Sequence, residues 1–553
     1  MMTTEHPTVA DSLGQVLRSL HGGPVFGVAS SGNFELLTSF VDNGGDYVAA
    51  CHEGGAVMMA DGWAQVTGGV GVASVHQGPR LTNATTALCD AAKGRTPLVL
   101  LAPQLPKNAS AGHQYVDQTS FLKGLDIGIE VDRLDEPTQA VDQLAAALRQ
   151  AQTRQQTIVL QLPLDALAAR VEKYEPQVPS PPQRRLGLDP GDVELVIEAL
   201  IRSHAPLILA GRGVILADAE DAVRELAEVI GAPLVVTAPA RGLFHGDPRL
   251  LGISGGFTAR WTRDHLVRAD LILAIGASLD TWATAGGRLL GGARVIQVTT
   301  EAHRTKEPRA EHLDADAARF SLGLVDSLRA HNGWTARQWG KATKIGSAAS
   351  VRADHRGAEL DPRTLLREIN RILPPDRVVA LDSGHFIALA AMHIDVDRPR
   401  GSLFGQAFQS VGLGVSRAVG AAFARPEVVT TAIVGDGGFI MGMQELDTAV
   451  RAQLPVLIVI INDSAYGAEV HDFVPFGFNP AIAQFPLRTF AAIARGFGAE
   501  AATVEVLDDL KHLHAWLRNP RRPMVLDCRV DPTVNAVLDM TEEGAAEWSL
   551  TRQ

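Results

Sequence analysis

Short runs of β-branched and other apolar residues recur along the chain, and most of them lead directly into a turn of small or polar residues. The first third contains five such runs, at residues 25–28, 47–52, 71–76, 97–102 and 157–162. A run that is apolar throughout is typical of a parallel strand that helices cover on both faces of the sheet. This pattern limits the chain to folds in which strands and helices alternate.

The same pattern restarts twice. The second series lies at residues 206–210, 232–237, 269–275 and 293–298, and the third lies at 378–381, 428–434, 456–461 and 523–526. A proline-rich segment at 176–182 and a polar segment at about 332–359 separate the series and are predicted to be linkers. We therefore predict an α/β protein with three doubly wound parallel-sheet domains, over residues 1–175, 186–330 and 360–553.

Composition excludes several classes of function. The net charge of −12 over 553 residues argues against nucleic-acid binding and against a basic membrane patch, since both need clustered Lys and Arg. No apolar stretch reaches the ~18 residues of a membrane span, and the first residues contain no apolar signal-peptide core. The three cysteines lie far apart and show no metal-site or disulfide spacing. We expect a cytoplasmic protein with a small-molecule partner.

Ligands of doubly wound sheets bind beyond the carboxyl ends of the strands. The run at 428–434 leads into Gly435, Asp436, Gly437 and Gly438, where glycines let the backbone approach a phosphate and Asp436 can bind a hard cation. Taken alone, this could be an ordinary turn between strand and helix. The next run, however, ends in Asn462 and Asp463, so two adjacent strands should bring two carboxylates together as a Mg²⁺ site completed by a diphosphate.

These two turns resemble the fingerprint of the thiamine-diphosphate-dependent 2-oxo acid decarboxylase and acetohydroxyacid (acetolactate) synthase family, in which Gly-Asp-Gly is followed by paired asparagines. The resemblance implies that Asp436, Asp463 and the main-chain carbonyl of Ala465 are the Mg²⁺ ligands. Asp463 replaces the second asparagine, which keeps an oxygen ligand and adds a negative charge. The remaining cofactor-binding residues of these turns would be Gly435, Gly437, Gly438, Tyr466 and Gly467.

Other segments carry the same resemblance. Glu53 follows the run at 47–52 and would contact the N1′ nitrogen of the cofactor, which activates its C2 carbon. Val411 would be the apolar wedge that bends the cofactor, and the Gln409 carbonyl would accept its 4′-amino group. Ser383, Gly384 and His385, which lie earlier in the sequence, would bind the diphosphate from the side opposite the two turns. The structural alternatives are a helix-opening carboxylate at Glu53 and helix-packing motifs elsewhere.

The resemblance covers nearly the whole chain and implies an N-terminal pyrimidine-binding domain, a central domain and a C-terminal diphosphate-binding domain. Family members build each active site from the first domain of one subunit and the third domain of another, so a homodimer or homotetramer is implied. Acetohydroxyacid synthases also hold FAD in the central domain. FAD is disfavoured here because Gly211-Arg212-Gly213 is an incomplete dinucleotide motif, and because the run at 293–298 leads into Thr299, Thr300 and Glu301 and not into an Asp-rich turn.

The residues on the substrate side point to more than one reaction. His76 is similar to the catalytic histidine of benzoylformate decarboxylases, and Glu469 is similar to the proton-relaying glutamate of pyruvate decarboxylases. His113 and Gln114 match half of the His pair of pyruvate decarboxylases and half of the Phe-Gln of acetohydroxyacid synthases. Each could also be an ordinary hydrogen-bonded residue. Arg80 replaces a glycine of the synthase pattern and could bind a carboxylate or simply cap a helix.

We therefore predict a lyase or transferase that cleaves or forms a carbon–carbon bond next to a carbonyl group, and specifically a 2-oxo acid decarboxylase of the benzoylformate decarboxylase type. The alternatives are a carboligase similar to acetolactate synthase, a hydrolase that cleaves a diketone, and a catalytically silent homologue that only binds the cofactor. Intact Glu53 and Asp436 argue against the silent homologue.

Overall fold

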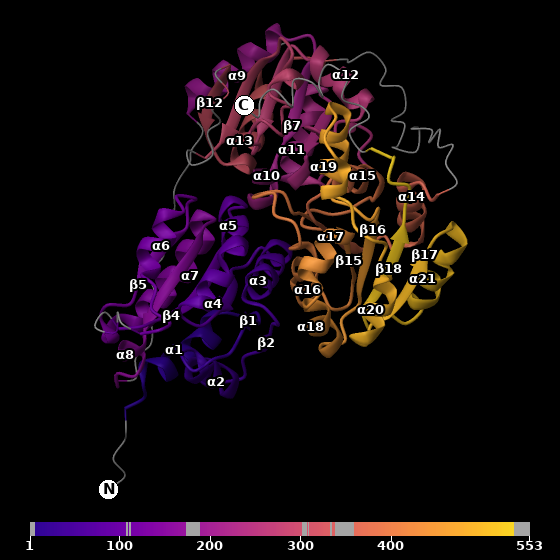
Figure 1. Cartoon of the computed structure of the whole chain (residues 1–553). Helices are drawn as coiled ribbons and strands as arrows, with labels where there is room; N and C mark the ends of the chain where they lie inside the picture. The colour runs from indigo at the N-terminus through magenta and orange to yellow at the C-terminus, as the bar shows by residue number, and fades with distance from the viewer. Residues whose placement is uncertain are drawn as a thin grey trace.

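Three separate six-stranded parallel sheets, each flanked by helices, make up the computed structural model (Figure 1). It describes residues 6–106, 109, 112–172, 189–300, 307, 309–331, 334–337 and 359–535. The predicted α/β class with three doubly wound sheets is confirmed. None of the helices in this part of the chain is both long and apolar enough to cross a membrane.

The first sheet has the strand order β2-β1-β3-β4-β6-β5. Its strands are β1 (Val25–Gly27), β2 (Tyr47–Ala49), β3 (Gly71–Ser74), β4 (Leu98–Gln104), β5 (Glu130–Arg133) and β6 (Thr157–Pro163). One face packs on α1 (Val9–Leu20), α2 (Phe34–Asp42) and α7 (Ala140–Arg154). The other face packs on α3 (Glu53–Thr67) and α5 (Thr85–Lys93). Burial of both faces explains why the inner strands are apolar throughout.

The second sheet has the order β12-β11-β10-β7-β8-β9. Its strands are β7 (Pro206–Ala210), β8 (Leu234–Thr237), β9 (Leu250–Ser254), β10 (Leu271–Ile275), β11 (Arg294–Thr299) and β12 (Ala310–Asp314). Among its helices are α9 (Pro190–Arg202), α10 (Arg212–Leu216), α11 (Glu220–Ile230) and α13 (Ala317–Ala330).

The third sheet repeats this plan in the order β14-β13-β15-β16-β18-β17. Its strands are β13 (Arg377–Leu381), β14 (Ser402–Phe404), β15 (Val429–Gly435), β16 (Val456–Asn462), β17 (Glu500–Val504) and β18 (Met524–Arg529). Helices that matter below are α16 (Gly414–Ala424), α17 (Asp436–Gly442), α18 (Glu445–Arg451), α19 (Gly467–Phe473) and α20 (Phe490–Gly496).

The apolar runs predicted from the sequence all correspond to strands, but five strands were missed: β5, β9, β12, β14 and β17. Every missed strand lies at the edge of its sheet. An edge strand has a neighbour on one side only and is less completely covered, so it need not be apolar throughout. The burial of β5 illustrates this, because none of its four residues is fully buried.

The two predicted linkers differ in outcome. Residues 176–182 lie outside the described residues. Of the second segment, 334–337 packs against the central domain: the indole Nε1 of Trp334 donates to the Val229 carbonyl at 3.1 Å, and the Arg337 amide donates to the Ile230 carbonyl at 2.8 Å. This part of the predicted linker therefore belongs to the surface of the central domain.

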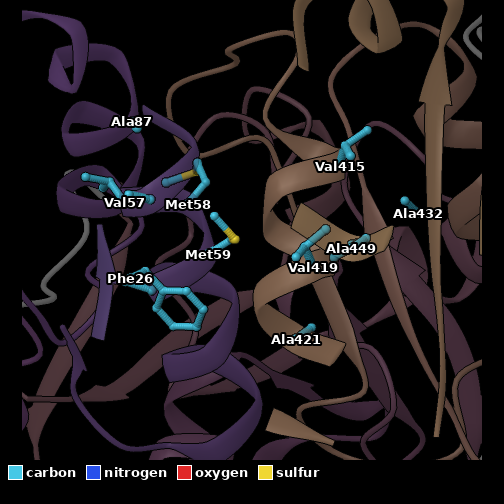
Figure 2. Packing of buried hydrophobic residues seen from close by; sticks show 14 of the residues in the cluster. Phe26, Val57, Met58, Met59, Ala87, Val415, Val419, Ala421, Ala432 and Ala449 are labelled. Carbon is cyan, nitrogen blue, oxygen red and sulfur yellow. The ribbon is translucent and has the colours of Figure 1, made fainter. Parts of the chain in front are cut away.

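The N-terminal and C-terminal domains meet where α3 crosses α16. Two glycines allow this close approach: a Cβ on Gly62 would lie 2.1 Å from the Arg417 carbonyl oxygen, and one on Gly420 would lie 1.9 Å from the Met59 carbonyl oxygen. Met58 and Met59 of α3 lie opposite Val415 and Val419 of α16 (Figure 2). One hydrophobic cluster therefore extends from the first sheet to the third.

Arg417 of α16 is fully buried inside this contact. Its Nε lies 2.8 Å from Asp61 of α3 and its Nη2 lies 2.5 Å from Asp90 of α5. Desolvation alone would lower the pKa of Arg417, but the two carboxylates outweigh it and raise the pKa above its ordinary value. The Thr96 hydroxyl also donates to Asp61, at 2.5 Å, so that both Asp61 oxygens are hydrogen-bonded.

Two further arginines, the half-buried Arg212 and the buried Arg241, join the central domain to its neighbours. Arg212 of α10 donates to the main-chain carbonyls of Gly94 and Arg95 in the N-terminal domain. Arg241 donates to the Ile394 carbonyl and to the Ser402 hydroxyl in the C-terminal domain. Burial lowers the pKa of both guanidiniums to about 10. Arg212, the only charged residue of Gly211-Arg212-Gly213, thus holds two domains together.

We expect Arg417→Met to lower the free energy of unfolding by about 3–5 kcal/mol, because it leaves the two buried carboxylates without their counter-charge. Urea denaturation of the cofactor-free protein measures this loss. Arg202→Ala is the matched control: Arg202 is exposed, with its partner Glu198 at 3.4 Å, and its loss should change stability by less than ~1 kcal/mol. Equal denaturation midpoints for the two variants would show that the Arg417 network does not stabilise the fold.

Candidate active site

The turns after β15 and β16 lie side by side at the carboxyl edge of the third sheet. These strands are parallel neighbours, with Gly435 opposite Ile461. Asp436 is therefore the first residue beyond β15 in α17, and Asp463 follows the end of β16. Both side chains are almost completely buried, since Asp436 is 3% exposed and the Asp463 side chain 4%.

Among the described residues, no Lys or Arg forms an ion pair with either carboxylate, although the charge of Arg488 offsets a small part of the burial of Asp436. Burial raises the pKa of Asp436 to about 6. Burial, together with the charge of Asp436, raises the pKa of Asp463 to about 7. Oδ2 of Asp463 is buried and has no hydrogen-bond partner among the described residues. A divalent cation between the carboxylates would offset both the burial of the two acids and the repulsion between them, so the residues fit a metal ion.

The protein offers this cation few ligands of its own. No group of three or more His, Cys, Asp or Glu residues with metal-binding geometry occurs in the described part of the chain. The nearest imidazole is that of His385, whose Nε2 lies 3.6 Å from Oδ2 of Asp463. Burial and the neighbouring His471 lower the pKa of His385 to about 3, so this ring is neutral. A metal ion here would need oxygens from the main chain and from a bound anion.

Glycines let the turns beside the two carboxylates pack closely. A Cβ on Gly437 would lie 2.6 Å from Cε1 of Tyr466, and one on Gly438 would lie 2.4 Å from Oδ2 of Asp382. A Cβ on Gly467 would lie 2.3 Å from Cε1 of His385. These positions therefore have no room for a side chain, and the backbone itself forms the surface of the turns.

The segment after β13 forms the opposite wall. Ser383 and Gly384 lie there, and the Ser383 hydroxyl donates to the Gln409 carbonyl at 3.3 Å. Gln409 has a left-handed backbone, with φ of +56°, which directs this carbonyl toward Ser383. The Gly412 amide donates to both oxygens of Asp382, at 3.1 and 3.0 Å. Val411 lies between Gln409 and Gly412 and is 38% exposed, so its side chain is accessible to a ligand.

The same loop is held from the N-terminal domain, which the sequence did not predict. Oδ2 of Asp90 accepts a hydrogen bond from the Phe408 amide at 3.2 Å, and Nζ of Lys93 lies 4.9 Å above the Phe408 ring. Asp90 and Lys93 belong to α5 and lie more than 300 residues before Phe408. No local motif signals a contact between residues so distant in sequence.

A second group of predicted site residues lies in the N-terminal domain. Glu53 opens α3, and its side chain is 4% exposed. Its Oε1 accepts from Nη1 of Arg80 at 2.7 Å, and its Oε2 accepts from Nδ2 of Asn83 at 3.0 Å. Burial alone would raise the pKa of Glu53. The hydrogen bonds from Asn83, from the Glu53 backbone and from Arg80 outweigh it, so the pKa is below its ordinary value.

His76 follows β3 close to this group. Its Nδ1 accepts a hydrogen bond from the Gly32 amide at 3.2 Å. Burial, then the charge of Arg80, lowers the pKa of His76, although a hydrogen bond with Gln114 opposes the shift. Oε1 of Gln114 in turn accepts from Nε2 of Gln77 at 3.1 Å. Because Nδ1 of the neutral ring accepts, we assign its proton to Nε2.

Two other predicted residues lie apart from both groups. His113 is exposed on a turn, although Gln114 beside it contacts His76. Glu469 is exposed on α19, on the wall of a cleft of about 3680 Å³ that residues of all three domains line. This cleft also exposes Asp436, Asp463 and Val411, whereas Glu53 and His76 are not among its lining residues. One chain therefore carries the predicted site as two separate halves.

Comparison with known proteins places this architecture in a family. Three domain models of the thiamine pyrophosphate enzymes match the chain: the N-terminal TPP-binding domain at residues 7–123, the central domain at 193–320 and the C-terminal TPP-binding domain at 382–528. The N-terminal match contains Glu53, and the C-terminal match contains Asp436 and Asp463.

Characterised relatives align over most of the chain. The sulfoacetaldehyde acetyltransferase of Castellaniella defragrans is 25% identical over 88% of this chain and 86% of its own length. The large subunit of acetolactate synthase isozyme 2 of Escherichia coli K12 is 26% identical over 94% and 95%. The fold also matches the thiamine diphosphate-dependent 4-hydroxybenzoylformate decarboxylase of Rhodococcus jostii RHA1, with a TM-score of 0.81 and 24% identity over 95% of this chain and 100% of that one.

The three matched domains show that the chain belongs to the thiamine pyrophosphate enzyme family. It is a thiamine-diphosphate-dependent enzyme of the group that includes decarboxylases, acetolactate synthases and acyltransferases.

We expect Gly467→Ala to destabilise the turn after β16 by about 1–3 kcal/mol, because the new methyl group would overlap His385 and Oδ2 of Asp463. The displaced Asp463 should also weaken thiamine diphosphate binding, which calorimetry measures. Gly496→Ala is the control, since a Cβ at Gly496 meets nothing within 4 Å. Equal cofactor affinities and melting temperatures for both variants would contradict this description of the turn.

Proposed function

We propose that this enzyme acts on a 2-oxo acid and releases CO₂ from it, as benzoylformate decarboxylases do. Thiamine diphosphate, when bound, supplies a nucleophilic carbon that takes up the electrons of the breaking carbon–carbon bond. The observation that carries the proposal is the N-terminal group, in which Arg80 binds the Glu53 carboxylate, and burial together with the charge of Arg80 lowers the pKa of His76. An acid and a base that share one neighbouring cation suit proton transfer at the cofactor and at the product.

Asp436 and Asp463 would hold Mg²⁺ together with the main-chain carbonyl of Ala465. The buried, unpartnered oxygen of Asp463 and the raised pKa values of both acids support this assignment. The diphosphate would lie against the tight turns and the wall after β13, at Gly435, Gly437, Gly438, Tyr466, Gly467, Ser383, Gly384 and His385.

The organic part of the cofactor would lie between the two halves of the site. Val411 would support its bend, and the Gln409 carbonyl, now bonded to Ser383, would accept from its amino group. Glu53 would hold a proton at pyrimidine N1′. Because Glu53 does not line the cleft of its own chain, a second copy would bring its Glu53 to the cleft. This supports a homodimer or homotetramer with active sites between subunits.

His76 is the proton donor that we favour, because the Gly32 amide fixes Nδ1 and leaves the ring proton on Nε2, where Gln114 is its hydrogen-bond partner. Glu469 lines the cleft and is the candidate for a second proton relay. His113 has weaker support, because it is exposed and, among the described residues, makes no contact with either group of site residues. A carboligase similar to acetolactate synthase is the second candidate, and the contact of Gln114 with His76 and Gln77 favours it.

We expect Asp436→Ala to abolish Mg²⁺-dependent binding of thiamine diphosphate in calorimetry. The cofactor-free variant should melt no lower than the wild type, because the substitution removes one of two buried like charges. Asp508→Ala, at an exposed acid of the same domain, is the control and should bind normally. Cofactor affinity that survives in Asp436→Ala would show that the metal site lies elsewhere.

A panel of 2-oxo acids, assayed for CO₂ and aldehyde with and without an added acceptor aldehyde, separates the two reactions. If His76 donates the proton, His76→Ala should lower aldehyde release by ~10²-fold or more while cofactor affinity stays the same. Carboligation to the acceptor should persist, because it needs no such proton. Wild-type rates of both products in His76→Ala would make His76 structural and would favour the carboligase.

A further inference from the structure

Arg80 has no role in the proposed function, yet it contacts the residue at its centre. It lies on α4 (Pro79–Asn83), which begins after a turn at Gly78 with φ of +62°. The synthase pattern that this segment resembles has glycine at the position of Arg80, so the guanidinium is a feature of this chain. Its Nη1 lies 2.7 Å from Oε1 of Glu53, and its side chain is 38% exposed against 4% for Glu53.

The other charged groups around Glu53 do not replace this cation. From α18, the buried Glu445 approaches the start of α3, where its carboxylate accepts from the amides of Cys51 and His52 at 2.9–3.2 Å. A carboxylate beside a carboxylate disfavours ionisation. From the same helix, Asp447 and Arg451 form an ion pair with each other at 2.7 Å.

The remaining neighbours are polar or neutral. His52 caps α3, with its Nδ1 accepting from the Gly54 amide at 3.0 Å, and Asn83 donates to Oε2 of Glu53. His76 lies beyond Arg80, whose charge helps to keep its ring neutral. Among the described residues around Glu53, the cation in direct contact with the carboxylate is therefore Arg80.

We propose that Arg80 is a positioning residue that sets how tightly Glu53 holds its proton: the guanidinium keeps the carboxylate ionised and, with Asn83, fixes its orientation. The inference rests on the proposed function of Glu53 at pyrimidine N1′. Each carboxylate oxygen has two lone pairs, so N1′ can bond to Glu53 without displacing Arg80 or Asn83. The proton shared between Glu53 and N1′ is then held less tightly than it would be by an uncompensated buried acid.

The direction of the effect follows from charge alone. A cation beside the shared proton favours its loss, so the pair gives up this proton at a lower pH with Arg80 than without it. Removing Arg80 should move the midpoint of any pH profile that reports this proton upward. Because the guanidinium is partly exposed and screened by water, we expect a shift of about one pH unit.

The rate of C2–H exchange of bound thiamine diphosphate, followed in deuterated buffer over a range of pH, tests this without any substrate. The variants are Arg80→Gln, which keeps the length, Arg80→Gly, which restores the glycine of the related pattern, and Arg80→Lys, which keeps the charge. The two neutral variants should bind the cofactor normally and show the upward shift, whereas Arg80→Lys should stay near the wild type. The Glu53→Gln variant gives the exchange rate in the absence of the Glu53 carboxyl group.

An unchanged midpoint in both neutral variants overturns the inference, and so does an equal shift in Arg80→Lys. Loss of cofactor binding in the neutral variants overturns it as well, because Arg80 would then be a binding residue. The proposed function fails separately, if the wild-type protein neither binds thiamine diphosphate nor exchanges its C2 proton.

The cofactor-free protein gives a readout that does not depend on the proposed function. The folded pKa of Glu53 is lowered, so its ionisation stabilises the fold above the unfolded pKa, and this contribution is lost as the pH falls through the folded pKa. Arg80→Gln should therefore melt lower than the wild type at neutral pH, and the difference should shrink as the pH falls through the folded pKa of Glu53. The Glu53→Gln background should abolish this pH dependence. A constant difference at all pH values would contradict the coupling.

Discussion

The buried guanidinium of Arg417 forms ion pairs with both Asp61 and Asp90 and thereby fixes how the N-terminal and C-terminal domains meet. Three buried charges tolerate little displacement, because each would lose a partner that water cannot replace. The loop before α16 depends on the same contact: one oxygen of Asp90 binds Arg417 and the other binds the Phe408 amide. The interaction that joins two domains therefore also places Val411, the residue proposed to support the cofactor.

The central domain is attached by the same chemistry. Arg212 reaches main-chain carbonyls of the N-terminal domain, and Arg241 reaches a carbonyl and a hydroxyl of the C-terminal domain. Each pair of domains is thus joined by a buried or half-buried arginine whose planar group satisfies several acceptors at once. Because the sheets themselves do not pair with one another, these arginines and the α3–α16 contact hold the three domains in one arrangement.

The two halves of the site differ in their electrostatics, and the difference matches their proposed tasks. Glu53 is a carboxylate whose oxygens already bind Arg80 and Asn83, which suits a residue that exchanges a proton while staying in place. Asp436 and Asp463 form no ion pair with Lys or Arg among the described residues and carry raised pKa values, which suits residues that bind a cation. Under the proposed function, one copy of the chain would supply the Glu53 group and another copy the Asp436 and Asp463 group, and together they would form one active site.

The sequence by itself determined the fold class, the inner strands and the pairing of Asp436 with Asp463, because these follow from local apolar runs and from the spacing of one strand–helix–strand unit. It did not reveal five of the six edge strands, such as β5, whose partial burial leaves no continuous apolar run. Only the tertiary structure showed that Arg80 binds Glu53, that Asp90 holds Phe408, and that Glu53 and Asp436 lie in separate halves of one chain. The physical reason is distance along the chain: hydrogen bonds and ion pairs between remote segments depend on how helices pack, and no local pattern encodes that packing.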